Sequence, residues 1–224
     1  MKLYISDLHF FHENLLKGLD KRPFSNINEM NNYLIEKWNE KVNGGDQVII
    51  LGDLFWSNKV DELNKILNKL KGQIALIEGN HDHNWLKKEG VNLNRFQWIK
   101  QYAEMEDKKR HVIACHYPIF CYNHQYLVNE EGNPRTYMLY GHVHNSHDVV
   151  LVNQFINITR STVLEGSKES RTIPCNMINC FCMFSDYAPL SLDEWIEVDK
   201  KRRAKMNNEE IIPQVEKQII KDEL

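Results

Sequence analysis

Aspartate, histidine and asparagine side chains, which bind metals and move protons, recur in five groups in the first two thirds of the chain. The groups are Asp7-x-His9, Gly52-Asp53, Gly79-Asn80-His81-Asp82, His116 and Gly141-His142-x-His144. A lone histidine is usually structural, but five such groups in 224 residues are hard to obtain by chance. A mixed carboxylate and imidazole set suits divalent Mn, Fe, Zn or Ni rather than ions that prefer thiolates. The pattern predicts a metal centre.

The spacing within two of these groups fits joint metal binding. Alternate residues at a strand end can point to the same side, so Asp7 with His9, and His142 with His144, could each hold one cation together. A glycine directly precedes three of the groups, which indicates that the backbone turns sharply beside the ions. The spacing therefore predicts that the metal ligands lie on tight loops.

The predicted strands place these groups at one edge of a sheet. Five apolar runs each end at one of the groups, at residues 3–5, 47–51, 73–77, 110–114 and 137–140. Amphipathic helical patterns at 28–42 and about 63–70 separate the first three strands. Alternating strands and helices predict a largely parallel sheet, and ligands bind outside the carboxyl ends of its strands.

The pattern is less regular after residue 95. Residues 96–105 and 110–114 are predicted to form two strands around a charged turn, and residues 172–186 indicate further strands. No element is predicted for residues 148–172. We expect one α/β domain over residues 1–198 and a charged helix or tail over residues 199–224.

The composition limits the class of protein. Hydrophobic residues make up 42% of the chain and charged residues 26%, which is ordinary for a globular domain. The formal net charge of −3 gives no overall positive field for nucleic acid or anionic lipid, so neither is expected as a main partner. Five cysteines without a C-x-x-C pair, beside ten histidines, favour a reduced compartment and imidazole chemistry.

The sequence shows no signal for entry into the secretory route, which favours the cytoplasm. No apolar run approaches the roughly 20 residues of a membrane span, and the apolar start is too short for a signal peptide. The chain ends Lys221-Asp222-Glu223-Leu224, which matches an ER-retention signal. We interpret this ending as coincidental, because no signal for entry into the secretory route accompanies it. We expect a cytoplasmic protein.

The five groups, in this order, resemble the signature of calcineurin-like metallophosphoesterases. The resemblance spans residues 3–144, and the ending at 188–192 is similar to the last strand of small bacterial and phage members. It implies an αββα sandwich, in which two mixed β-sheets are flanked by helices and the metal site lies at the carboxyl ends of the strands. The match is specific for the superfamily and weak for any one substrate.

The resemblance implies a role for each residue. Seven residues would hold two divalent ions, with Asp7, His9 and His144 on the first, Asn80, His116 and His142 on the second, and Asp53 bridging both. The ions would lie about 3.5–4 Å apart, with the attacking hydroxide between them. His81 would protonate the leaving alkoxide, and Asp82 would orient the His81 ring. Manganese is the ion expected to serve best in vitro.

Departures from other members narrow the expected function. The arginines that mark Ser/Thr protein phosphatases are missing, because Leu54 follows Asp53 and Gly79 precedes Asn80. The DNA-repair nucleases are longer, and the lipid-A pathway pyrophosphatases carry acidic residues that are absent here. We expect hydrolysis of a small soluble phosphate ester, favouring a phosphodiester of a nucleotide. A phosphomonoesterase of the same fold and a catalytically weak metal-binding scaffold are the alternatives.

Two further residues are candidates for contact with the substrate. His12 could reach the site from the first loop, and Arg22 could bind a substrate phosphate. An ordinary solvent-exposed role is the alternative for each. The natural substrate, the native metals and the oligomeric state stay open at this point.

Overall fold

Two four-stranded β-sheets form the centre of the protein, whose computed structural model describes residues 1–165 and 170–208. The first sheet is entirely parallel and contains β1 (Lys2–Ile5), β2 (Gln47–Ile50), β3 (Gln73–Ile77) and β4 (Phe96–Lys100) in that order. The second contains β5 (Tyr102–Asp107), β6 (Arg110–Cys115), β7 (Thr136–Tyr140) and β8 (Met177–Asn179). Only the β5–β6 pair of this sheet is antiparallel.

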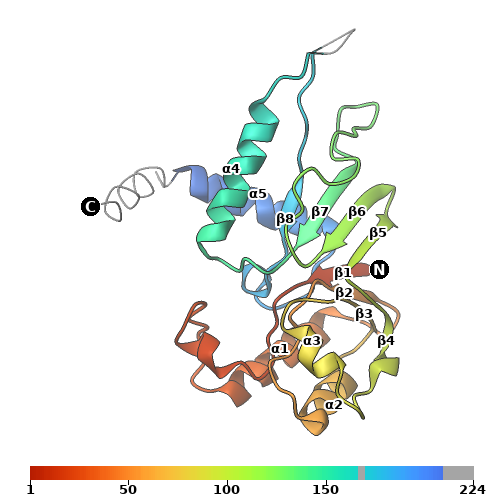
Figure 1. Cartoon of the computed structure of the whole chain (residues 1–224), viewed down its shortest axis with the longest axis vertical. Helices are drawn as coiled ribbons and strands as arrows, with labels where there is room; N and C mark the ends of the chain where they lie inside the picture. Colours follow the sequence, from red (N-terminus) through yellow and green to blue (C-terminus); the bar gives the residue numbers. More distant parts are fainter. Residues whose placement is uncertain (166–169, 209–224) are drawn as a thin grey trace, which may run out of the picture.

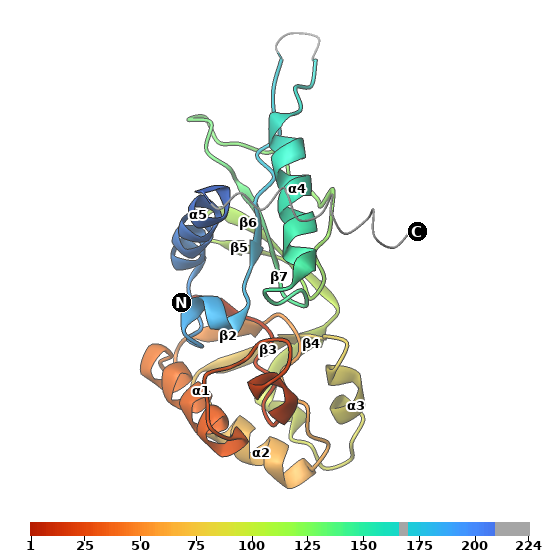
Figure 2. The same cartoon turned by 90° about the vertical axis from the view of Figure 1, so that its left-hand side faces the viewer.

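Helices cover the two sheets. The α-helices are α1 (Ile27–Lys41), α2 (Val60–Lys69), α3 (Asp82–Leu86), α4 (His147–Ser161) and α5 (Leu192–Asn208). Short 3-10 turns are η1 (Glu13–Leu16), η2 (Leu93–Arg95) and η3 (Cys182–Ser185). The first sheet lies with α1, α2 and α3 in the lower part of Figure 1, and Figure 2 shows α4 and α5 on opposite sides of the second sheet.

The alternation of side chains along each strand builds three apolar clusters. Leu3 and Ile5 of β1 face the cluster under α1 and α2, whereas Tyr4 between them faces the second sheet. Successive side chains of a strand point to opposite faces, so a strand with both faces buried is apolar throughout. The third cluster lies between the second sheet and α4. The αββα sandwich implied by the resemblance is therefore confirmed.

The single strand predicted for residues 96–105 is wrong. The segment is two strands in two sheets: β4 ends at Lys100 and pairs with β3, and β5 begins at Tyr102 and pairs with β6. Gln101 is the only residue between them. Lys100 and Gln101 interrupt the apolar pattern only briefly, and which strand each half pairs with depends on residues distant in the chain.

The region after residue 147 also differs from expectation. Residues 148–172, for which no element was predicted, contain most of α4, and its N-cap Ser146 accepts a hydrogen bond from the Asp148 amide (3.3 Å). In 172–186, only β8 is a strand. Helix α5 crosses residue 198, where we drew the domain limit, and that division stays a prediction. The rest of the tail, with its last four residues, lies outside the described residues.

No helix in the described part of the chain combines the length and the apolar composition that a membrane crossing requires.

Candidate metal centre

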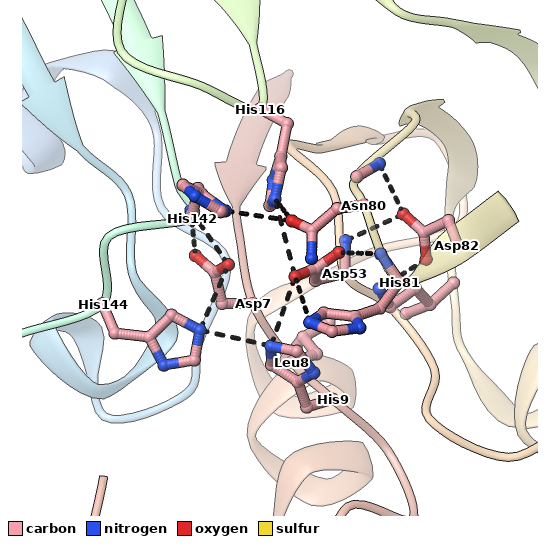
Figure 3. Close-up of polar contacts among 12 residues, drawn as sticks. Asp7, Leu8, His9, Asp53, Asn80, His81, Asp82, His116, His142 and His144 are labelled. Carbon is pink, nitrogen blue, oxygen red and sulfur yellow. Dashed lines mark hydrogen bonds and ion pairs between the residues drawn. The ribbon is translucent and has the colours of Figure 1, made fainter. Parts of the chain in front are cut away.

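The five groups of polar residues converge at the carboxyl ends of β1, β2, β3, β6 and β7, where the two sheets meet (Figure 3). Asp53 lies at the middle of the set. Its Oδ2 atom is 3.5 Å from Nε2 of His9 and 3.5 Å from Nε2 of His116. One carboxylate oxygen therefore faces imidazoles from two separate groups.

The residues expected to bind the first metal are Asp7, His9 and His144, all of them buried. Nε2 of His144 lies 3.5 Å from Oδ1 of Asp7 and 3.2 Å from Nε2 of His9. One ligand atom from each residue lies within 4.8 Å of the others. These three side chains have the donor types and spacing of a metal site.

The residues expected to bind the second metal meet at the side-chain oxygen of Asn80. This oxygen lies 3.0 Å from Nε2 of His116 and 2.9 Å from Nδ1 of His142. His142 and His144 thus face different partners, which corrects the expectation from spacing that they grip one cation together. The backbone is left-handed at both residues (φ 69° and 48°), and separate partners hold the two rings, because Nδ1 of His142 faces Asn80 and Nδ1 of His144 faces Asp20.

Hydrogen bonds behind two of the histidines fix the nitrogen that faces the centre. Nδ1 of His116 lies 2.8 Å from the carbonyl oxygen of Leu51, which can only accept, so Nδ1 carries the proton. Nδ1 of His144 lies 2.7 Å from Oδ1 of Asp20 in the same arrangement. Both rings therefore present Nε2 to the centre, as metal-ligating histidines with such partners do.

The buried negative charges of Asp7 and Asp53 are stabilised by positive charge close to them. Burial raises the pKa of Asp7, but the hydrogen bond and charge of His144 outweigh it and hold this pKa well below its usual range. Burial lowers the pKa of His116, but its hydrogen bond to Asp53 raises it to about 9. Burial lowers the pKa of His9 to about 3, so this ring is the neutral form that binds metals. Divalent cations satisfy all of these groups at once, so the residues fit a metal pair.

The ligand loops hold a strained backbone. Five of the seven candidate metal ligands have a left-handed φ between 48° and 69°, namely Asp7, His9, Asp53, His142 and His144. Such conformations are uncommon in residues other than glycine and cost free energy, and they cluster at functional sites. The strain lets each strand end turn its side chain into the centre.

The glycines at these loops mainly provide space. A Cβ atom would lie 2.2 Å from Nδ1 of His116 at Gly52, 2.3 Å from Oδ1 of Asp53 at Gly79, and 2.5 Å from Oδ2 of Asp7 at Gly141. Only Gly52 has a left-handed φ (95°), so the sharp turn predicted for all three occurs at that one. The other two glycines let the backbone approach a carboxylate closely.

His81 lies at the open side of the centre. Its side chain is 38% exposed, its Nε2 is 3.9 Å from Oδ2 of Asp53, and its backbone amide donates to Oδ1 of Asp53 (2.9 Å). Trp56, which sequence reasoning missed, packs beside this ring (centroids 4.6 Å apart). The ring can therefore reach a group bound above Asp53.

Asp82 does not orient the His81 ring, which corrects the expected role. Its fully buried carboxylate accepts hydrogen bonds from the amides of Asp53, Leu54 and Gly79 and from Nε1 of Trp85 (2.8–2.9 Å). Among the described residues, none of its hydrogen bonds goes to the His81 ring. Asp82 instead ties the loop after β2 to the loop after β3, and so positions two metal-ligand loops together.

Arg22 is not available to a substrate phosphate. It is only 2% exposed and donates to the carbonyl oxygens of Leu8 (2.7 Å) and Asp7 (2.9 Å) below the centre. It also pairs with Asp20 (2.9 Å), the residue that supports His144. The expected substrate contact is therefore wrong, and Arg22 positions the first metal loop.

His12 lies at the rim of the centre, where its ring stacks on Trp56 (centroids 3.7 Å apart, planes 3° apart). Trp56 is 44% exposed, which is unusual for so large an apolar side chain. The position of His12 is compatible with the substrate contact expected for it. That contact stays a prediction.

The five cysteines are free thiols. Cys182 donates to the carbonyl oxygen of Asp7 (3.1 Å), and burial raises the pKa of its thiol to about 12. This sulfur beside the centre is therefore a protonated structural group and no nucleophile.

Known proteins resemble this chain in sequence and in fold. The family model for the calcineurin-like phosphoesterase superfamily domain matches residues 1–157. An uncharacterized protein of Methanocaldococcus jannaschii is 32% identical over 202 residues, which are 89% of this chain and 92% of that protein. The crystal structure of a protein of unknown function from Aquifex aeolicus has a similar fold, with a TM-score of 0.54 and 22% identity over 88% of this chain and 98% of that one. The chain belongs to the calcineurin-like phosphoesterase superfamily.

Proposed function

We propose that the protein hydrolyses a phosphodiester of a nucleotide or a similar small soluble substrate, using two divalent cations. Membership of the superfamily supports metal-dependent hydrolysis of phosphoesters in general. The observation that carries the proposal is Oδ2 of Asp53, which lies 3.5 Å from Nε2 of His9 and 3.5 Å from Nε2 of His116. A carboxylate oxygen in this position suits a bridge between two cations.

Each residue of the centre has a distinct task in this proposal. Two cations held there supply Lewis acidity, which stabilises charge on the phosphoryl group and makes water acidic enough to attack near neutral pH. His9 and His116 would each hold one cation beside Asp53, because Nε2 of each lies 3.5 Å from Oδ2 of that carboxylate. Asp20 holds His144 in the tautomer that presents Nε2.

His81 is the candidate proton donor to the leaving oxygen. It is the half-exposed imidazole at the open side of the centre, next to the bridging carboxylate. A proton donor matters most when the leaving oxygen is strongly basic, as in a ribose or alkyl ester. This role favours natural diesters over activated aryl esters as substrates.

The test compares hydrolysis of bis-p-nitrophenyl phosphate and p-nitrophenyl phosphate with added manganese. We expect turnover of the diester to exceed that of the monoester, and the Asp53→Asn variant to lose activity on both. A preference for the monoester would support the alternative phosphomonoesterase. No turnover of either ester with two manganese ions bound would support the metal-binding scaffold instead.

A further inference from the structure

A cavity of about 1070 Å³ lies far from the candidate metal centre, at the amino ends of β6 and β7. Its wall includes Arg110, the first residue of β6, and Arg135, which directly precedes β7. The metal-ligand loops follow the other ends of the same strands, whose arrowheads point toward the first sheet in Figure 1. Helix α5 contributes Lys200 and Arg203 to the wall.

The lining of this cavity is strongly cationic. Seven lysine and arginine side chains line it against three acidic ones, in a chain whose formal net charge is −3. The seven come from the β5–β6 turn, the start of β6, the segment before β7, α4 and α5, so separate elements bring them together. A concave surface lined by one sign of charge focuses the field and attracts counter-ions.

Neighbouring carboxylates neutralise only part of this charge. Asp193 is shared by Lys108 (2.9 Å) and Arg110 (2.6 Å), so one negative charge serves two cations. Asp199 is likewise shared by Arg202 (3.0 Å) and Arg203 (2.6 Å). A net positive charge is left facing the cavity.

Of the remaining cations, Lys200 pairs with Glu197 (2.7 Å), whereas the other three find neutral partners or none in the described part of the chain. Arg160 donates to the carbonyl oxygen of Pro174 (2.7 Å) and to Oδ1 of Asn176 (3.3 Å). The side chains of Lys109 and Arg135 make no hydrogen bond or ion pair with any residue in the described part of the chain. Arg160 and Arg203 both line this wall, and burial and the charge of Arg203 lower the pKa of Arg160.

We propose that this cavity binds a small anion that carries two or more phosphate groups. Guanidinium groups bind phosphate oxygens through paired N–H donors, and several cations on different elements fit several phosphates better than one. The cavity is as large as the sites that hold small ligands. The proposal does not depend on the proposed hydrolysis.

Calorimetric titration with inorganic tripolyphosphate tests the proposal, in EDTA and about 150 mM salt so that non-specific surface attraction is screened. We expect one tripolyphosphate per chain, with affinity reduced about tenfold or more in Arg135→Glu and in Lys109→Glu. Lys65→Glu, an exposed lysine on α2, is the matched control and should bind as the wild type does. Circular dichroism establishes that each variant is folded.

Three outcomes would overturn the proposal. They are the absence of tripolyphosphate binding to the wild type, equal affinity in the wild type and Arg135→Glu, and an equal loss in Lys65→Glu. Binding of a single-stranded oligonucleotide more tightly than tripolyphosphate, with loss in Arg135→Glu, would assign the cavity to nucleic acid instead.

Discussion

Single atoms determine how charge is divided in the candidate metal centre. The two oxygens of Asp53 differ: Oδ2 faces the imidazoles, whereas Oδ1 accepts the backbone amide of His81 (2.9 Å). The bridge and the proposed proton donor are therefore linked through one side chain. Replacing the His81 side chain keeps the backbone amide that donates to Asp53. Mutation of His81 can therefore remove the proposed proton donor while the proposed metal bridge stays in place.

Replacing His81 with Asn should lower turnover on an alkyl phosphodiester by about 10²–10⁴-fold, which is the usual contribution of a general acid. The loss on bis-p-nitrophenyl phosphate should be much smaller, because p-nitrophenolate leaves without a proton. Turnover on both substrates at matched manganese occupancy checks this prediction. His83→Asn, an exposed histidine two residues away, is the control. Equal losses on both substrates would show that His81 positions the substrate or the metals.

Asp20 supports a metal ligand without facing the centre itself. The Asp20→Asn variant should bind manganese about 10–100-fold more weakly, because His144 loses the carboxylate that fixes its tautomer. The manganese concentration that gives half-maximal activity measures the change. Glu36→Gln, at an exposed position of α1, should leave it unaltered. An unchanged manganese requirement in Asp20→Asn would remove Asp20 from the centre.

Sequence reasoning could name the candidate ligand residues but not the residues that support them. Asp20 lies in an irregular loop, and its partner His144 is 124 residues away, so no local pattern joins them. Asp82 directly follows His81, and this adjacency suggested a shared role. The direction of the Asp82 carboxylate is set by four donors that come from the fold.

At the scale of elements, the strand ends and their loops place the ligands. The loops after β2 and β3 are tied by Asp82, and the glycine before Asn80 leaves room for Asp53. Neither loop can shift without the other. The geometry of the centre therefore depends on the space that small residues provide as much as on the ligands.

Adding one methyl group at Gly79 should disturb the centre, since the new Cβ would lie 2.3 Å from Oδ1 of Asp53. We expect Gly79→Ala to lose at least tenfold in metal affinity and most of its activity. Gly44→Ala is the matched control, because nothing lies within 4 Å of a Cβ there. Manganese titration of both variants measures the effect. Similar metal affinity in the two would show that the close approach has no functional importance.

The elements that sequence reasoning found are those with a clear local pattern of apolar residues. β3 was predicted at residues 73–77, as observed, because a short apolar run stands between Gly72 and a polar loop. Helix α4 was missed because exposed Leu151 and Ile158 obscure the apolar face formed by its buried residues. The crossing at Gln101 was missed because strand pairing is decided by partners distant in the chain.

For the whole molecule, the important feature is that both sheets contribute candidate metal ligands. Asp7, Asp53 and Asn80 follow strands of the first sheet, whereas His116 and His142 follow strands of the second. Cations bound between them would connect the two layers of the sandwich. Bound metal should then stabilise the entire fold, in addition to any role in catalysis.

Removing metal with EDTA should lower the melting temperature of the whole domain in one transition. A ligand at about 100 times its dissociation constant adds about 2.7 kcal/mol, which for a chain of this size corresponds to roughly 5–10 °C. Differential scanning calorimetry with and without manganese measures the shift. Asp53→Asn should show a smaller one. A melting temperature that does not respond to manganese would mean that the sheets are not joined through the centre.

The most direct test of the two-cation centre is anomalous X-ray diffraction from crystals grown with manganese. We expect two anomalous peaks per chain, about 3.5–4 Å apart, with Asp53 between them, the first beside His9 and His144 and the second beside His116 and His142. In Asp53→Asn crystals both peaks should weaken. A single peak, or peaks away from these side chains, would contradict the assignment of Asp53 as the bridge between two metals.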